Sequence, residues 1–357
     1  MKILAFTEAP NHVCARYRIE PFAWDLAQRG LLLEVWPLRR GPARLVQLRA
    51  ARRFGAVLLQ RKLLPPWQFV LLRRAARRLV YDVDDAVFQR DSYHPKGPES
   101  WSRTARFWAT VYAADTVIAG NDYLRDRVAA FVEPRKVEVV PTCVNPRWYR
   151  LAEHRRTGGA VRLAWIGSTS TLESLRRAES RLGAVSRRLP GIELRLICDR
   201  HLELDSTRVT LRPWSSATEA TDLADADIGV SWLPDDGWSR GKCGLKVLQY
   251  MAAGLPVVAN PVGVHRELVL DGRTGLLGDT PQQWAAAVAR LAADPALRRR
   301  LGAAGRRMVE RHYSVDVWGP RLADIIAATV QQPEVAPACP VPDAWEPVGL
   351  KPVGSCV

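Results

Sequence analysis

The sequence of 357 residues lacks the features that define several classes of protein. Its six cysteines are scattered and form no C-x-x-C pair, which argues against a disulfide scaffold and against a structural zinc site. No run of about 18 apolar residues occurs, so we expect no membrane-spanning helix. The apolar stretch after Met1 is too short for the core of a signal peptide and indicates a buried first strand. These absences favour a cytoplasmic protein.

Acidic residues are absent between Glu34 and Asp82, an interval rich in arginine, and the whole sequence has a formal net charge of +15. Two interpretations remain open. The arginines decorate solvated helix faces, or they form a surface that attracts polyanions such as anionic lipid headgroups or nucleic acid. Residues 42–49 mix leucine and arginine at roughly helical spacing, which is typical of an amphipathic helix on a membrane surface. No zinc-finger spacing, basic zipper or RNA-binding strand motif supports nucleic acid.

Short apolar segments alternate with helical patterns along most of the chain. The expected strands cover residues 2–6, 31–36, 56–60, 78–83, 116–119 and 137–140, then 161–166, 193–197, 209–211, 228–232 and 256–259. Continuous apolar strands separated by helices are typical of a parallel sheet that is covered on both faces. We therefore predict an α/β protein of two doubly wound, Rossmann-like domains that face each other across a cleft.

Changes in composition predict the domain boundaries. The first domain spans residues 1–152 and the second spans residues 160–330, with a polar, glycine-bearing linker between them. A final helix near residues 315–329 could cross back to the first domain. Residues 331–357 are rich in proline and poor in apolar clusters, so we expect a disordered tail.

The turn Gly167-Ser168-Thr169-Ser170 is a candidate anion-binding site in the second domain. It follows a predicted strand and precedes a predicted helix, so backbone N–H groups, hydroxyls and the helix dipole converge there. The alternative is a helix that Ser170 or Thr171 caps with nothing bound.

Residues 237–260 form the most informative segment, in which a basic, glycine-containing loop enters a helix. Arg240 and Lys242 precede this helix, and Lys246 and Gln249 lie three residues apart on one of its faces. Such a cluster can neutralise a pyrophosphate while Gln249 hydrogen-bonds the hydroxyls of a ribose. The alternative is a solvated basic loop beside a core helix.

With its pattern G-K-C-G-x-K-x-L-Q-Y-M-A, this segment resembles the retaining glycosyltransferases of family 4, which have the GT-B fold. Residues 263–269, 271–277 and 294–314 are similar to further parts of that family, so the resemblance is specific over residues 161–330 and looser before them. The resemblance implies a hexosyltransferase-like enzyme that transfers a sugar from a nucleotide-sugar to a glycan or lipid-linked acceptor. It also implies retention of configuration and no metal at the diphosphate.

The resemblance also implies roles for residues of the second domain. Gly167 to Thr169 and the three cations Arg240, Lys242 and Lys246 would lie near the diphosphate, with Gln249 near the ribose and Gly263 and Val264 beside the donor. Many relatives carry two glutamates eight positions apart, where this sequence has Gly241 and Gln249. The sugar contacts of the first glutamate are therefore unassigned, and Asp235 and Asp236 are candidate replacements.

In the first domain, Asp82, Asp84 and Asp85 follow a predicted strand. Carboxylates at i and i+2 can share a hard cation, which is one interpretation. The others are that Asp82 and Asp84 contact the acceptor or position the reacting groups, or that they pair with neighbouring arginines. Asp84 falls near the position where relatives carry a histidine close to the donor sugar.

Three further residues of the first domain are candidates for binding. Arg16 and Arg18 stand at the head of the first predicted helix, where they would grip an anionic acceptor or the donor phosphates, or simply start a surface helix. Asn121, in a turn that resembles one in the family, is either a helix cap or a ligand.

The sequence therefore predicts a glycosyltransferase with three sets of site residues. They are Asp84, Arg240 and Lys246 as catalytic residues, Gly167, Ser168, Thr169, Ser170, Lys242, Gln249, Gly263 and Val264 as donor-binding residues, and Arg16, Arg18, Asp82 and Asn121 as acceptor-binding residues. We predict no metal site and no cofactor beside the nucleotide-sugar substrate, and a peripheral location at the inner face of the cell membrane. The alternatives are a catalytically silent GT-B protein and a protein that binds an anionic membrane or nucleic acid.

Overall fold

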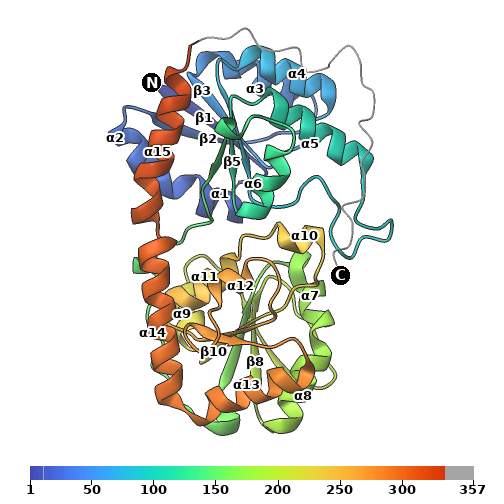
Figure 1. Cartoon of the computed structure of the whole chain (residues 1–357), viewed down its shortest axis with the longest axis vertical. Helices are drawn as coiled ribbons and strands as arrows, with labels where there is room; N and C mark the ends of the chain where they lie inside the picture. The colour runs from blue at the N-terminus through green and yellow to red at the C-terminus, as the bar shows by residue number, and fades with distance from the viewer. Residues whose placement is uncertain (11, 334–357) are drawn as a thin grey trace.

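A computed structural model describes residues 1–10 and 12–333, which form two lobes stacked along the long axis of the molecule (Figure 1). Each lobe contains a parallel six-stranded sheet, in the order β2-β1-β3-β4-β5-β6 in the N-terminal lobe and β12-β11-β10-β7-β8-β9 in the C-terminal lobe. The predicted fold class of two doubly wound α/β domains is confirmed.

The strands follow the apolar segments of the sequence closely. In the N-terminal sheet they are β1 (Lys2–Thr7), β2 (Leu32–Pro37), β3 (Ala56–Gln60), β4 (Leu79–Val83), β5 (Thr116–Ala119) and β6 (Val137–Val139). In the C-terminal sheet they are β7 (Arg162–Ile166), β8 (Glu193–Cys198), β9 (Arg208–Pro213), β10 (Ile228–Ser231), β11 (Val257–Ala259) and β12 (Gly275–Leu277). The short strand β12 was not among the strands that the sequence predicted.

The helices cover both faces of each sheet. Those of the N-terminal lobe are α1 (Val13–Arg18), α2 (Ala23–Gln28), α3 (Pro42–Ala50), α4 (Pro66–Ala75), α5 (Trp101–Ala113) and α6 (Asp122–Ala129). Those that follow are α7 (Leu172–Arg177), α8 (Glu179–Arg188), α9 (Glu219–Ala224), α10 (Gly237–Arg240), α11 (Leu245–Ala252), α12 (His265–Leu268), α13 (Pro281–Ala293), α14 (Pro295–His312) and α15 (Val315–Gln331). Short 3-10 turns are η1 (Glu20–Phe22), η2 (Ala51–Arg53), η3 (Pro134–Lys136), η4 (Pro146–Trp148), η5 (Gly158–Ala160) and η6 (Thr169–Thr171).

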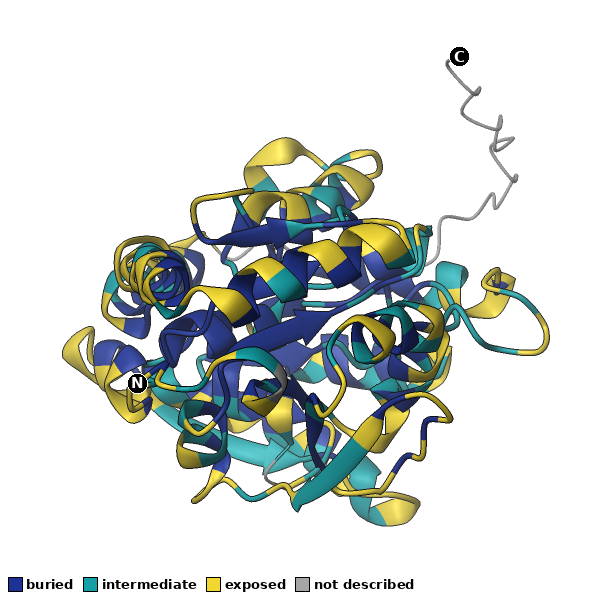
Figure 2. Ribbon diagram, turned by 90° about the horizontal axis from the view of Figure 1, so that it is seen from below, coloured by how far each residue is buried: buried dark blue, intermediate teal, exposed yellow. Residues whose placement is uncertain are grey.

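Side chains of β1 show how the sheet is covered on both sides. Leu4 and Phe6 face one apolar core, whereas Ile3 and Ala5 face another, because successive side chains of a strand point in opposite directions. Both cores are closed to solvent, and the outer faces of the surrounding helices carry the exposed residues (Figure 2). A strand that is buried on both faces has a continuous run of apolar residues, and this run is what made the strand predictable from the sequence.

The last helix returns to the N-terminal lobe. Leu322 and Ile326 of α15 belong to the same apolar core as Ile3 and Ala5 of β1. The Thr329 hydroxyl lies 2.8 Å from that of Thr116 on β5. Figure 1 shows α14 and α15 running along one side of both lobes. The C-terminal helix is therefore part of the N-terminal lobe's packing.

Two chain segments cross between the lobes and pair with each other. The Val144 N–H donates to the carbonyl of Tyr313 at 3.0 Å, and the Val315 N–H donates to the carbonyl of Val144 at 3.1 Å. The two segments that connect the lobes are thus hydrogen-bonded to each other through their backbones. None of the helices in residues 1–10 and 12–333 is long and apolar enough to cross a membrane. The tail predicted at residues 331–357 lies outside the described residues from residue 334 onward.

Close packing of α14 on the C-terminal lobe gives a test of this architecture. A Cβ atom at Gly302 would collide with the carbonyl oxygen of Gly254, whereas one at Gly305 would lie 3.0 Å from the flexible Met251 side chain. We expect Gly302→Ala to lower the free energy of unfolding by about 2 kcal/mol, because backbone cannot move aside cheaply. Gly305→Ala is the matched control and should cost less than about 1 kcal/mol, since alanine favours the helix. Urea unfolding followed by circular dichroism measures both, and equal losses would contradict this packing.

Candidate functional site

The lobes meet where a loop after β4 faces the loop between α10 and α11. The Lys242 ammonium lies 2.8 Å from a carboxylate oxygen of Asp85. The Cys243 thiol donates to the carbonyl of Asp84 at 3.2 Å. A Cβ atom at Gly241 would lie only 2.7 Å from the backbone nitrogen of Ala86. The contact is therefore tight enough to require glycine at position 241, the place where relatives were expected to carry a glutamate.

Asn121 adds a second bridge between the lobes. Its side-chain oxygen accepts from the N–H of Leu124 at 2.9 Å and so caps α6. Its amide nitrogen donates to the carbonyls of Arg240 and Lys242 at 3.2 and 3.0 Å. Both ends of this side chain are engaged, so the structure gives Asn121 a capping and bridging role in place of the predicted acceptor contact.

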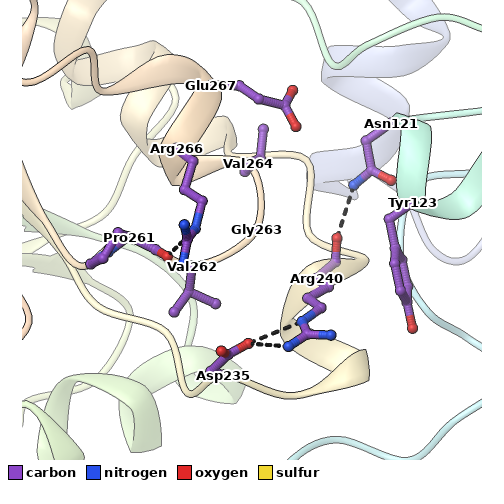
Figure 3. A pocket seen from close by; sticks show the side chains of 10 residues that line it. All are labelled: Asn121, Tyr123, Asp235, Arg240, Pro261, Val262, Gly263, Val264, Arg266 and Glu267. Atoms are coloured by element: carbon purple, nitrogen blue, oxygen red, sulfur yellow. Dashed lines mark hydrogen bonds and ion pairs between the residues drawn. The ribbon is translucent and has the colours of Figure 1, made fainter. Parts of the chain in front are cut away.

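A pocket of about 320 Å³ opens beside this contact (Figure 3). Both lobes line it, with Asn121 and Tyr123 from the N-terminal lobe and Asp235, Arg240, Pro261, Val262, Gly263, Val264, Arg266 and Glu267 from the C-terminal lobe. The Arg240 guanidinium is paired with Asp235, at 2.8 and 3.0 Å. The predicted donor residues Arg240, Gly263 and Val264 therefore share one pocket.

Lys246 and Gly167 border a different feature, the indole of Trp165. The Lys246 ammonium lies 4.2 Å from the centre of that ring system, and a Cβ atom at Gly167 would lie 2.5 Å from its edge. Neither residue lines the 320 Å³ pocket. Burial and the nearby charge of Lys242 lower the pKa of Lys246 to about 7. The predicted donor residues thus fall into two groups, with Lys242 electrostatically coupled to the second.

The turn after β7 already holds a carboxylate. The backbone N–H and the hydroxyl of Thr169 donate to Asp199 at 2.9 and 2.8 Å. The hydroxyls of Ser168 and Ser170 lie 2.8 Å from each other, and all three residues of this turn are exposed. The turn has the donors for an anion, as predicted, and an incoming phosphate would exchange with Asp199.

Gln249 is placed differently from its prediction. It is only 4% exposed, and its amide nitrogen donates to the hydroxyls of Tyr17 and Tyr149 at 3.0 and 3.3 Å. The Tyr17 hydroxyl in turn donates to Glu219 at 2.6 Å. In this arrangement the amide donors of Gln249 are used up inside the protein, so the predicted ribose contact is not formed from them.

Arg18 and Asp82 are a buried ion pair and not free acceptor ligands. Their side chains are each 3% exposed, and the Arg18 Nε lies 2.9 and 3.1 Å from the two Asp82 oxygens. The Val140 carbonyl accepts a further bond from Arg18 at 3.0 Å. Charges so deeply buried are tolerated only when they are paired, which assigns this pair to the N-terminal lobe's interior. In this arrangement the two side chains bind each other, and their roles in acceptor binding stay predictions.

Arg16 also acts between the lobes. Its guanidinium lies 3.0 Å from Glu219 and faces the rings of Trp148 and Trp214 at 5.9 and 6.0 Å. The predicted grip on an anionic acceptor is replaced by a carboxylate of the other lobe. Glu219 thus receives bonds from Arg16 and Tyr17 together, a convergence that no spacing in the sequence indicated.

Asp84 remains a candidate for a polar role in the cleft. Its carboxylate lies 3.4 Å from Arg61 Nε, and one oxygen is buried without a hydrogen-bond partner. Burial alone would raise its pKa, but the charges of Arg61 and Arg18 lower the pKa of this carboxyl below its ordinary value. Among residues 1–10 and 12–333, no group of three or more histidine, cysteine or acidic side chains is placed to hold a metal ion. Arg18 pairs with Asp82 and Arg61 pairs with Asp84, as in the interpretation that these carboxylates pair with arginines.

Arg61 is the site residue that sequence reasoning undervalued. It directly follows β3, and its guanidinium lies 2.8 Å from both the Cys14 sulfur and Asp85. Its backbone has φ = 41°, a left-handed conformation that costs a non-glycine residue free energy. Its position at the carboxyl end of a buried parallel strand was the signal that could have identified it.

Comparison with known proteins agrees with this architecture. Residues 152–294 match the family model described as "Glycosyl transferases group 1". The chain is 30% identical over 240 residues to D-inositol 3-phosphate glycosyltransferase from Actinosynnema mirum, which covers 57% of this chain and 55% of that protein. It is 31% identical over 189 residues to the GDP-mannose-dependent alpha-(1-6)-phosphatidylinositol monomannoside mannosyltransferase of Mycolicibacterium smegmatis, covering 50% and 42% of the two chains. The chain thus spans about half the length of these curated relatives.

Solved structures extend the similarity to nearly the whole chain. Sucrose-phosphate synthase from Thermosynechococcus elongatus superimposes with a TM-score of 0.72 at 16% identity, over 92% of this chain and 98% of that one. Anabaena Alr3699/HepE in complex with UDP and glucose gives a TM-score of 0.68 at 14% identity, over 92% and 100%. The chain therefore has the GT-B fold, and residues 152–294 are similar to the glycosyl transferases group 1 family.

The lowered pKa of Lys246 gives a test of whether a bound diphosphate contacts its ammonium group. In the free protein an amine with a pKa of about 7 is mostly neutral at pH 8. A bound diphosphate should raise this pKa toward its ordinary value, so binding at pH 8 should take up about one proton and weaken as pH rises above 7. Calorimetry with UDP or GDP in two buffers of different ionisation enthalpy measures the uptake. Lys246→Met should abolish it, and unchanged uptake in that variant would exclude Lys246 as its source.

Proposed function

We propose that this chain is a glycosyltransferase that uses a nucleotide-sugar donor and binds the donor's diphosphate with the C-terminal lobe. The observation that carries the proposal is that Lys242 lies at the interlobe contact, close enough to Lys246 to lower its pKa, within residues that match the glycosyl transferases group 1 model. Arg240 lines the adjacent pocket. Anabaena HepE, which shares this fold, was solved in complex with UDP and glucose, and the mannosyltransferase relative is named as GDP-mannose-dependent. Donors with a uracil or a guanine base are therefore the first candidates.

The reaction needs positive charge more than it needs a proton-transfer residue. Negative charge builds on the leaving diphosphate as the bond to the sugar breaks, and fixed cations in a site with little water stabilise that charge. Lys242 and Lys246 are the cations proposed for this role, with N–H groups of the Gly167–Ser170 turn as further donors. Closure of the lobes would exclude water and protect the donor from hydrolysis.

The finer assignments rest on the resemblance of the sequence to family 4. They are retention of configuration, independence of a metal ion, and a place for Asp84 near the donor sugar. The partly unsatisfied carboxylate of Asp84 at the interlobe contact supports the last of these. The catalytically silent alternative would bind a nucleoside diphosphate and show no transfer to any acceptor.

A thermal-shift and calorimetry panel of UDP, GDP, UDP-glucose and GDP-mannose tests the donor site. We expect one nucleotide class to stabilise the wild type, and we expect Lys246→Ala and Arg240→Ala to weaken its binding by about tenfold each, because each removes a charge-assisted contact to phosphate. Arg187→Ala, on the exposed face of α8, is the control and should bind like the wild type. Equal binding by all variants would disprove the donor assignment.

We further propose that the acceptor is lipid-linked and that the N-terminal lobe docks on an anionic membrane. The leucines of residues 42–49 do not support the predicted in-plane helix, because Leu48 of α3 is fully buried against the core. The exposed surface of this region consists of arginine side chains and a small amount of apolar surface. Val46 and Trp67 are 68% and 58% exposed, and they are surrounded in sequence by the exposed arginines Arg39, Arg40, Arg49, Arg52, Arg53, Arg74 and Arg77.

Charge complementarity supports an anionic membrane as the occupant of this surface. No acidic residue occurs between Glu34 and Asp82, so the helices α3 and α4, which pack on each other, carry no carboxylate of their own. An anionic headgroup layer attracts each such arginine by about 1 kcal/mol. The name of the mannosyltransferase relative includes a phosphatidylinositol acceptor, which fits the same location.

Vesicle sedimentation tests the membrane surface. Wild-type protein should bind vesicles with about 30% phosphatidylserine and should not bind neutral vesicles, and raising the salt should weaken binding. The charge reversal Arg52→Glu with Arg53→Glu should reduce binding by about tenfold or more, given about 1 kcal/mol per charge. The matched reversal Arg187→Glu with Arg188→Glu in the other lobe should have little effect. Equal retention on neutral vesicles would count against the proposal.

A further inference from the structure

Asp85 is shared between the two lobes. It is 6% exposed, and one of its carboxylate oxygens lies 2.8 Å from the Arg61 guanidinium and 2.8 Å from the Lys242 ammonium. Its other oxygen accepts from the N–H of Ala86 at 3.0 Å. Arg61 belongs to the lobe that carries Asp85, whereas Lys242 belongs to the opposite lobe. A carboxylate of the N-terminal lobe thus pairs with a lysine of the C-terminal lobe that is predicted to bind the donor phosphates.

The other predicted donor groups are also occupied, but within their own lobe. Arg240 pairs with Asp235, and the Thr169 N–H donates to Asp199. These pairs involve exposed side chains and do not depend on how the lobes are arranged. Of these three pairs, the one between Lys242 and Asp85 both occupies a predicted phosphate ligand and holds the lobes together.

We propose that Asp85 is a built-in competitor of the donor diphosphate, which pairs with Lys242 across the cleft and is displaced when the nucleotide binds. This inference rests on the proposed donor function of Lys242. The exchange is balanced in charge, because Lys242 passes from a carboxylate to a phosphate oxygen. Asp85 is not left bare, since Arg61 and the Ala86 N–H continue to bind it.

The position of Arg61 fits this role. Its left-handed backbone, with φ = 41°, is a conformation that persists only where surrounding structure enforces it. Held in this way, its guanidinium faces Asp85, Asp84 and the Cys14 sulfur at once. The N-terminal lobe can therefore keep its acidic loop neutralised whether or not Lys242 is present.

The loop that carries Asp85 extends the closed contact. It continues from Asp84 to Ser100, between β4 and α5, and it reaches the C-terminal lobe a second time through Tyr93. The Tyr93 ring lies 4.6 Å from the Arg177 guanidinium of α7 and 6.3 Å from the Trp238 ring of α10. Release of Asp85 from Lys242 would remove one of the contacts that this loop makes with the C-terminal lobe, while the Cys243–Asp84 bond and the Tyr93 contacts remain.

The test compares Asp85→Asn with Asp91→Asn, a control in the same loop whose carboxylate accepts a local bond from the Tyr93 N–H. Asparagine at 85 keeps one acceptor oxygen, which can serve either Arg61 or the Ala86 N–H, and loses the charge that attracts Lys242. Calorimetry with UDP and GDP should show about fivefold tighter binding by Asp85→Asn, because the binding-competent fraction rises when a competing ion pair is removed. Asp91→Asn should bind like the wild type.

Two further measurements separate the causes. In a Lys242→Met background, Asp85→Asn should give no gain, and a gain that persists there would mean that Asp85 acts through Arg61 and would overturn the proposal. Small-angle scattering of the ligand-free proteins should show a larger radius of gyration for Asp85→Asn than for the wild type or Asp91→Asn. Asp85→Ser serves as a second variant if Asp85→Asn folds poorly.

The outcomes distinguish this inference from the proposed function. If wild type and Asp85→Asn bind the nucleotide equally and scatter identically, the competitor role is wrong and the donor site stands. If no nucleotide binds to the wild type or to either variant, the donor assignment itself fails and the competitor role fails with it.

Discussion

The approach of Gly241 to Ala86 determines how close the two lobes can come. Only a residue without a side chain fits against the Ala86 backbone, at a distance of 2.7 Å for a hypothetical Cβ atom. With the loops at this separation, Asp85 reaches Lys242 and the Cys243 thiol reaches the Asp84 carbonyl. A glutamate at position 241 would force the loops apart and break both contacts. The glycine is therefore a structural condition of this closed arrangement, whatever sugar contact it removes.

The same reasoning explains the second departure from the family pattern. Gln249 donates to two tyrosine hydroxyls, one of which donates to the nearly buried carboxylate of Glu219. A glutamate at position 249 could not donate these bonds and would place a second carboxylate in the same buried cluster, which electrostatics disfavours. Both replacements thus fit contacts between the lobes. Because the two replacements change the interlobe surface together, neither of them indicates that an active site has lost its function.

The sequence predicted the fold well because buried parallel strands are continuous apolar runs whose ends can be seen in the amino-acid order. It also predicted the basic loop before α11, because the residues of that loop are adjacent in the sequence. It did not indicate that Arg18 and Asp82, which are 64 positions apart, pair with each other in the folded N-terminal lobe. It also did not indicate the hydrogen-bond partners of Gln249, which are Tyr17 of α1 and Tyr149, one residue after η4. Which charges face solvent and which face each other depends on the lobe arrangement, and no local pattern encodes that arrangement.

The two kinds of contact between the lobes differ in what can replace them. The crossing segments at Val144 and Tyr313–Val315 are paired through backbone groups, and α15 is anchored by apolar side chains of the N-terminal core. No small ligand can substitute for either. One contact at the cleft is made by a carboxylate and an ammonium, and a phosphate can take the place of that carboxylate without leaving a charge unpaired. An opening motion would therefore preserve the crossing segments as its joint, and its amplitude would be set by the polar contacts at the cleft.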